Sequence, residues 1–190
     1  MSHQINTSKF NFRTDLAIEE VINDNNLLIE NINDIKVTTI IIDDSNNKKI
    51  RKKDGKYITI EFNDATDFNN SKQIEEIFIQ KFKEFLNDYK IKDDDTCLIV
   101  GLGNENSTPD SLGPLTINNI LVTNHFYFLG INVEEGFRSV AAINPGVMGQ
   151  TGIETFDIIK SITNQIKPDF IIVIDSLKAS QVNKINKQYK

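Results

Sequence analysis

The stretch that decides the fold is CLIVGLGN at residues 97–104, which continues into TPDSLGP at residues 108–114. Apolar residues without polar alternation predict a parallel strand covered on both faces, and the glycines after them let the backbone turn sharply out of the sheet. Pro109 and Pro114 bracket the next loop, and Pro114 can open a helix because its missing N–H is not needed in the first turn. Asp110 lies on this loop, outside the carboxyl end of the strand, where open α/β sheets place their ligand crevice.

The glycines of this loop do not complete a nucleotide motif. A dinucleotide fingerprint needs a third glycine where Asn106 stands, and the sequence has no Gly-Lys-Ser or Gly-Lys-Thr of a phosphate loop. We therefore expect no nucleotide site here.

The composition predicts a cytoplasmic globular protein with one core. The chain has 190 residues, of which 39% are hydrophobic and 25% charged. A net charge of −6 without an extended basic block argues against a nucleic-acid partner. No apolar run is long enough to cross a bilayer, and the single cysteine, Cys97, can form no internal disulfide. We therefore expect no membrane partner.

Two further apolar runs, at residues 140–143 and 170–174, predict strands parallel to the first. Apolar side chains recur at helical spacing after Pro114 and again through residues 153–166, where Thr151 and Glu154 match a capping box. This alternation predicts an α/β fold with a mainly parallel sheet and right-handed crossovers. The carboxyl ends of the strands then share one rim.

The first part of the chain predicts a polar leader and an added antiparallel hairpin. Residues 1–12 lack periodicity, and residues 16–21 suggest a short amphipathic helix. The hairpin pairs residues 35–43 with residues 57–62, after a turn at Asp54-Gly55. A long helix follows it, with Ser71 as the expected cap and an apolar face formed by Ile74, Ile77, Phe78, Phe82, Phe85, Leu86 and Tyr89.

The residues that could do chemistry are found by elimination. Neither Gly-x-Ser-x-Gly nor His-Glu-x-x-His occurs, His125 lies within a predicted helix, and Cys97 begins a buried strand. That leaves Asp110 and Asp175, which follow two of the three parallel strands at the shared rim. The third strand is followed by a glycine-rich loop whose N–H groups can face an extended or anionic ligand. A helix cap is the competing interpretation of Asp175.

Several motifs resemble the germination protease family of spore-forming bacteria. They are GLGN and TPDSLGP at 101–114, PGVMGQTGIET at 145–155, PDFIIVID at 168–175 and RTDLA at 13–17. The resemblance implies an atypical aspartic-type endopeptidase, made as a zymogen, that starts degradation of small acid-soluble spore proteins during germination. It implies a three-layer fold similar to hydrogenase maturation proteases, a homotetramer, and a location in the spore core.

The resemblance also assigns roles to residues. The proposed catalytic aspartates of the family match Asp110 and Asp175, and the processing site matches the bond between Asp15 and Leu16. The expected organisation is therefore a propeptide at residues 1–15 and a peptidase domain at residues 16–190. Family members continue well past this point, so we expect the C-terminal strands of the sheet to be missing.

Two questions stay open at the level of sequence. The aspartates can activate a water with one carboxyl protonated and one ionised, without a cofactor, or they can hold a bridging metal. The chain can be an active endopeptidase, or a truncated, catalytically inactive remnant that at most binds peptide.

Overall fold

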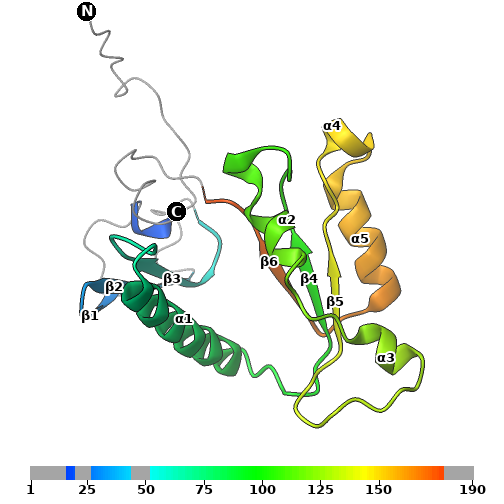
Figure 1. The fold of residues 1–190 in the computed structure, drawn as a ribbon, viewed down its shortest axis with the longest axis horizontal. Coiled ribbons are helices and arrows are strands. Elements are labelled where there is room, and N and C mark those ends of the chain that lie inside the picture. The colour runs from blue at the N-terminus through cyan, green and yellow to red at the C-terminus, as the bar shows by residue number, and fades with distance from the viewer. Residues whose placement is uncertain (1–15, 20–26, 44–51, 178–190) are drawn as a thin grey trace, which may run out of the picture. The chain divides into compact units, whose positions relative to one another are not determined.

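The computed structural model describes residues 16–19, 27–43 and 52–177. They form two compact units, one of residues up to Glu84 and one of Phe85–Ser176, and each is described by itself (Figure 1). The leader at residues 1–15, including Asp15, lies outside the described residues. So does a helix that the sequence predicts at residues 177–186, apart from Leu177 itself.

The first unit contains an antiparallel sheet in the order β1 (Leu27–Ile32), β2 (Ile35–Ile42) and β3 (Gly55–Glu61). The predicted hairpin is confirmed as the pair β2 and β3, with Ile40 opposite Tyr57. The sheet has one strand more than predicted. Asn33 and Asp34 join β1 to β2, and Asn33 adopts the left-handed conformation (φ 54°) that such tight two-residue turns favour.

Strand β2 is buried on both faces because its alternating side chains meet different elements. Ile35 and Val37 pack with Ile77 of α1 (Phe68–Asp88). Ile40 and Ile42 pack with Ala17 of the 3₁₀ helix η2 (Ala17–Glu19). This helix falls within the helix expected at residues 16–21, whose last two residues lie outside the described residues.

Helix α1 begins before the predicted cap. The carboxylate of Asp67 accepts hydrogen bonds from the backbone N–H groups of Asn69 (3.0 Å) and Asn70 (3.1 Å), which satisfies donors that the first turn leaves unpaired. Ser71 therefore lies inside the helix, and the prediction that it caps α1 is wrong.

The second unit is built on a parallel sheet in the order β5 (Val140–Ile143), β4 (Cys97–Gly101) and β6 (Phe170–Ile174). All five residues of β4 are buried. Ile99 is opposite Ala142 on one side and Ile172 on the other, so the strands are in register at their carboxyl ends. The predicted α/β class and the three parallel strands are confirmed.

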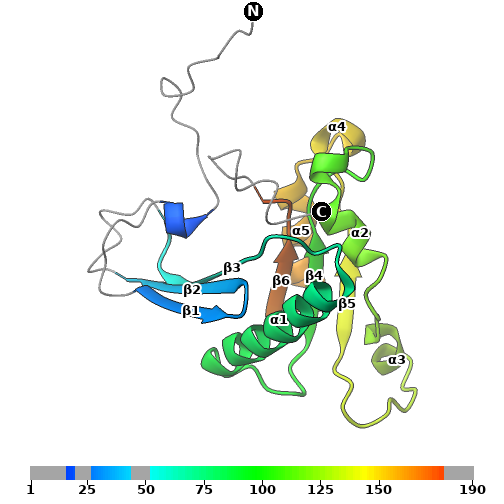
Figure 2. The same cartoon turned by 60° about the vertical axis from the view of Figure 1, so that its left-hand side comes forward.

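Two connections cover this sheet (Figures 1 and 2). From β4 to β5 the chain forms η3 (Thr108–Asp110), α2 (Leu112–Ile117) and α3 (Asn124–Phe128). From β5 to β6 it forms α4 (Met148–Thr151) and α5 (Thr155–Ile166). Because these two crossovers run in opposite directions along the sheet, right-handed connections place α2 and α5 on opposite faces.

The structure corrects the predicted start of the helix before β6. Gly152 has φ 71° and ends α4, and the Thr151 hydroxyl accepts a hydrogen bond from Ile153 N–H (3.2 Å). Glu154 precedes α5 without a side-chain cap bond, so the predicted capping box is wrong. The helical spacing at residues 153–166 predicts that Ile153 and Phe156 face the core, but both are exposed.

Strand β6 is covered less completely than its apolar sequence predicts. Phe170, Ile172 and Ile174 are half-buried, whereas Ile171 and Val173 on the other face are 40% and 53% exposed. Among the described residues, no helix buries Ile171 and Val173 on this face of β6.

Candidate active site at the carboxyl edge of the parallel sheet

Asp110 ends η3, the single 3₁₀ turn that follows β4, and it is half-buried. Three backbone-linked hydrogen bonds close the loop: Asn104 N–H donates to Asp110 O (2.9 Å), Asp110 N–H donates to Ser107 O (2.8 Å), and Asn106 N–H donates to Asn104 Oδ1 (3.0 Å). The loop that carries the carboxylate is therefore internally braced.

The glycines of the loop allow close approach of backbone to backbone. A Cβ at Gly101 would lie 2.4 Å from Gly113 O, and a Cβ at Gly113 would lie 2.2 Å from Leu102 O. Both positions therefore need glycine so that α2 can pack directly on the end of β4. This steric requirement explains Gly101, the first glycine of the incomplete nucleotide motif.

Asp175 directly follows β6, and its side chain is exposed. Its Oδ1 accepts a hydrogen bond from the Ser176 N–H (2.7 Å). One residue earlier, Ile174 O accepts a hydrogen bond from Leu102 N–H (2.8 Å), which joins the end of β6 to the end of β4. Asp110 and Asp175 therefore follow two neighbouring strands, β4 and β6, at the same edge of the sheet.

This edge includes the place where the topology reverses. The chain passes from β4 to β5 on one side and then crosses back to β6 on the other side of β4. In open α/β sheets, ligands bind outside the carboxyl ends of the strands at such a switch point. The two aspartates follow the two strands, β4 and β6, that flank it.

The loop after β5 joins the same edge. Gln150 in α4 donates a hydrogen bond from Nε2 to Asn104 Oδ1 (2.8 Å), and Gly146 O accepts one from the Thr155 hydroxyl (3.1 Å). Helix α4 has only four residues, so it offers no long helix dipole for the anionic ligand considered above. Sequence reasoning missed Asn104 and Gln150, because no pattern links two residues so far apart in the chain.

Other reactive groups of the second unit do not gather near the two aspartates. Cys97 is buried at the start of β4, and this burial raises the pKa of its thiol to about 11, which leaves almost no thiolate near neutral pH. His125 is exposed on α3. In the part of the chain that the structure describes, no three His, Cys, Asp or Glu side chains are close enough together to hold a metal ion.

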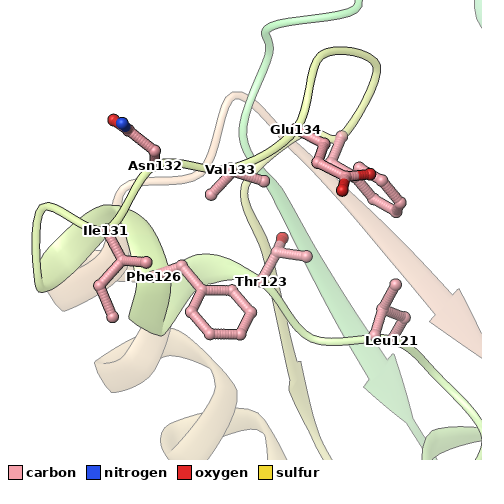
Figure 3. Close-up of a pocket in the computed structure, with 8 residues that line it drawn as sticks. Leu121, Thr123, Phe126, Ile131, Asn132, Val133 and Glu134 are labelled. Atoms are coloured by element: carbon pink, nitrogen blue, oxygen red, sulfur yellow. The ribbon is translucent and has the colours of Figure 1, made fainter.

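A pocket of about 280 Å³ lies at the opposite edge of the sheet, around α3 (Figure 3). It is near the start of β5, where Thr123 N–H donates to Val140 O (3.0 Å). The buried Thr123 hydroxyl is already engaged, donating to Arg138 O and accepting from Val140 N–H. The pocket contains neither aspartate, and it is lined by Leu121, Thr123, Phe126, Ile131, Asn132, Val133, Glu134 and Phe137.

The expected processing site falls partly within the structure. Leu16 is buried and precedes Ala17 of η2, while Asp15 lies outside the described residues. Across the described residues, no helix has the length and apolar character that spanning a bilayer requires.

Comparisons with known proteins agree with one another. A family model described as germination protease matches residues 3–190. The germination proteases of Geobacillus sp. (strain WCH70) and of Halalkalibacterium halodurans are 43% and 39% identical over 98% of this chain. That of Bacillus velezensis is 42% identical over 97%. Because the matches cover 55% of each of these relatives, the chain spans about half the length of the curated relatives it matches.

Proposed function

Because the chain belongs to the germination protease family, we propose that it is an endopeptidase that starts degradation of small acid-soluble spore proteins during spore germination. The observation that carries this proposal is the position of Asp110 and Asp175 after the neighbouring strands β4 and β6, at one edge of the parallel sheet. There the Leu102 N–H to Ile174 O hydrogen bond joins the two strand ends.

The mechanism that we propose uses the two carboxyl groups on one water molecule. The ionised carboxylate accepts a proton from the water as the water oxygen attacks the peptide carbonyl carbon. The protonated carboxyl donates its proton toward the carbonyl oxygen, which limits the charge that develops there. The mechanism needs no cofactor, and a bridging metal is the alternative for the same two residues.

The proposal extends to regulation and assembly. Cleavage between Asp15 and Leu16 would remove residues 1–15 as a propeptide, and the mature protein would begin at Leu16. We further propose that the full-length protein is a homotetramer located in the spore core, with small acid-soluble spore proteins as its substrates and neither nucleic acid nor membrane as a partner.

The test of the activity is direct. Purified chain is incubated with a small acid-soluble spore protein, and the products are mapped by mass spectrometry. The proposal predicts cuts at one or a few defined peptide bonds. Folded protein that binds the substrate and leaves it intact would contradict the proposal and favour the inactive, peptide-binding remnant.

A further inference from the structure

Asn104 is the residue through which three parts of the candidate site meet. Its N–H donates to Asp110 O (2.9 Å), and its side-chain Oδ1 accepts from Asn106 N–H (3.0 Å) and from Gln150 Nε2 (2.8 Å). The last bond joins two loops that follow different strands, since Asn104 follows β4 and Gln150 belongs to α4 after β5. Both views of the fold show α4 near the loop that carries η3 (Figures 1 and 2).

From this arrangement we propose that Asn104 and Gln150 are positioning residues, which fix α4 relative to the loop that presents the Asp110 carboxyl group. The inference rests on the proposed function. A peptide substrate that lies along this edge would contact both loops, so their spacing would set the distance from its scissile carbonyl to Asp110. Displacements of about 1 Å at a reacting centre can lower rates by up to about a hundredfold.

The fold does not depend on this bond alone. Helix α4 is closed by the Gly152 N–H to Met148 O bond (2.8 Å), and its loop is tied to α5 by the Thr155 hydroxyl. Gln150 is exposed and Asn104 is half-buried, so the bond between their side chains is accessible to water. Losing it should therefore change stability little, while the relative placement of the two loops changes more.

The substitutions that test the proposal differ in hydrogen-bonding capacity and keep similar size. Gln150→Leu removes the donor, and Asn104→Leu removes the acceptor. Asn104→Asp keeps an oxygen that can accept from both Gln150 and Asn106. Gln165→Leu is the matched control, because Gln165 is an exposed glutamine on α5 whose side chain makes no hydrogen bond within the described residues.

The experiment measures kcat and KM for cleavage of a small acid-soluble spore protein, with thermal melting as the check on folding. We expect Gln150→Leu and Asn104→Leu each to lower kcat about 10- to 100-fold with KM within about twofold. The double variant should lose no more than Asn104→Leu alone, since Asn104→Leu already removes the bond to Gln150, together with the bond from Asn106 N–H. Asn104→Asp should recover most of the lost kcat relative to Asn104→Leu, and Gln165→Leu should match the wild type.

The outcomes separate this inference from the proposed function. Wild-type protein that cuts nothing overturns the proposed function, and this inference with it. Wild-type protein that cuts, together with an unchanged kcat in Gln150→Leu or multiplicative losses in the double variant, overturns the positioning role alone. A loss of kcat that only follows a loss of folded protein also overturns it.

Discussion

The backbone carbonyl of Asp110 lies directly against Gly103. A Cβ at position 103 would stand 2.1 Å from Asp110 O and 3.2 Å from its Oδ1, and Gly103 has φ 121°, a conformation that residues with a side chain rarely adopt. The position of the candidate catalytic residue therefore depends on the absence of a side chain seven positions earlier in the chain.

Gly103→Ala should displace the loop that carries Asp110. Both the clash with a backbone atom and the strained φ act on this loop, so we expect a loss of stability of about 1–3 kcal/mol. Cleavage activity should fall by more than about tenfold. Thermal melting and the cleavage assay measure the two effects. Gly149→Ala is the control, since a Cβ there has nothing within 4 Å, and equal behaviour of the two variants would contradict the account.

Cys97 should be unreactive in the folded protein. Its thiol is buried and its pKa is raised to about 11, while alkylation requires the thiolate. Iodoacetamide near neutral pH should modify the protein only as fast as it unfolds, and denaturant should make the single cysteine react at once. Rapid modification of native protein, measured by intact mass, would show that β4 is not buried as described.

Asp169 should contribute to stability in a pH-dependent way. Its carboxylate accepts hydrogen bonds from the Thr96 N–H (2.8 Å) and hydroxyl (2.7 Å), and these bonds lower its pKa below the ordinary value of 3.8. A lowered folded-state pKa gives stabilisation that is present above the unfolded value and lost as the pH falls through the folded value. Asp169→Asn should therefore melt below the wild type near neutral pH, with the difference shrinking below about pH 3.8.

The measurement for Asp169 is the melting temperature of the wild type and of Asp169→Asn across the acidic pH range. A difference that stays constant with pH would mean that ionisation of Asp169 has no part in joining the starts of β4 and β6.

Lys81 should anchor α1 to the antiparallel sheet. Its ammonium group lies 2.6 Å from the Glu30 carboxylate and 3.2 Å from that of Glu84, and the hydrogen bond with Glu30 is the largest cause of its raised pKa. Lys81→Met leaves Glu30 without this cation, so we expect a loss of about 1–3 kcal/mol in the free energy of unfolding. Lys83→Met, at an exposed position of the same helix, should change the free energy of unfolding by less than about 0.5 kcal/mol. Equal effects in denaturant titrations would contradict the anchoring role.

The parallel sheet was predictable because its strands are short apolar runs, each followed directly by glycine, asparagine and proline, or aspartate. The runs at 97–100, 140–143 and 170–174 became β4, β5 and β6, and Asp110 and Asp175 lie beyond the ends of β4 and β6 as expected. Strand β1 was missed because Leu27–Ile32 has little alternation of its own, and its strand form follows from pairing with β2.

The remaining details depend on backbone conformation and long-range contacts. The left-handed Gly152 ends the short helix α4, and α5 begins only at Thr155, although Thr151 and Glu154 fit a capping box. The bond from Gln150 to Asn104 exists only because β4 and β5 are neighbours in the sheet. Contacts of this kind leave no local signal in the sequence. The hydrogen bond between the two loops of the site could therefore be found only in the structure.

The central claim is that Asp110 and Asp175 together carry the cleavage reaction. The most direct measurement is kcat for cleavage of a small acid-soluble spore protein by Asp110→Asn and by Asp175→Asn, with Asp157→Asn on the exposed surface of α5 as the control. The account predicts that each of the first two loses at least about a thousandfold in kcat while melting within a few degrees of the wild type, and that the control is unchanged. Wild-type activity in either Asp110→Asn or Asp175→Asn would contradict it.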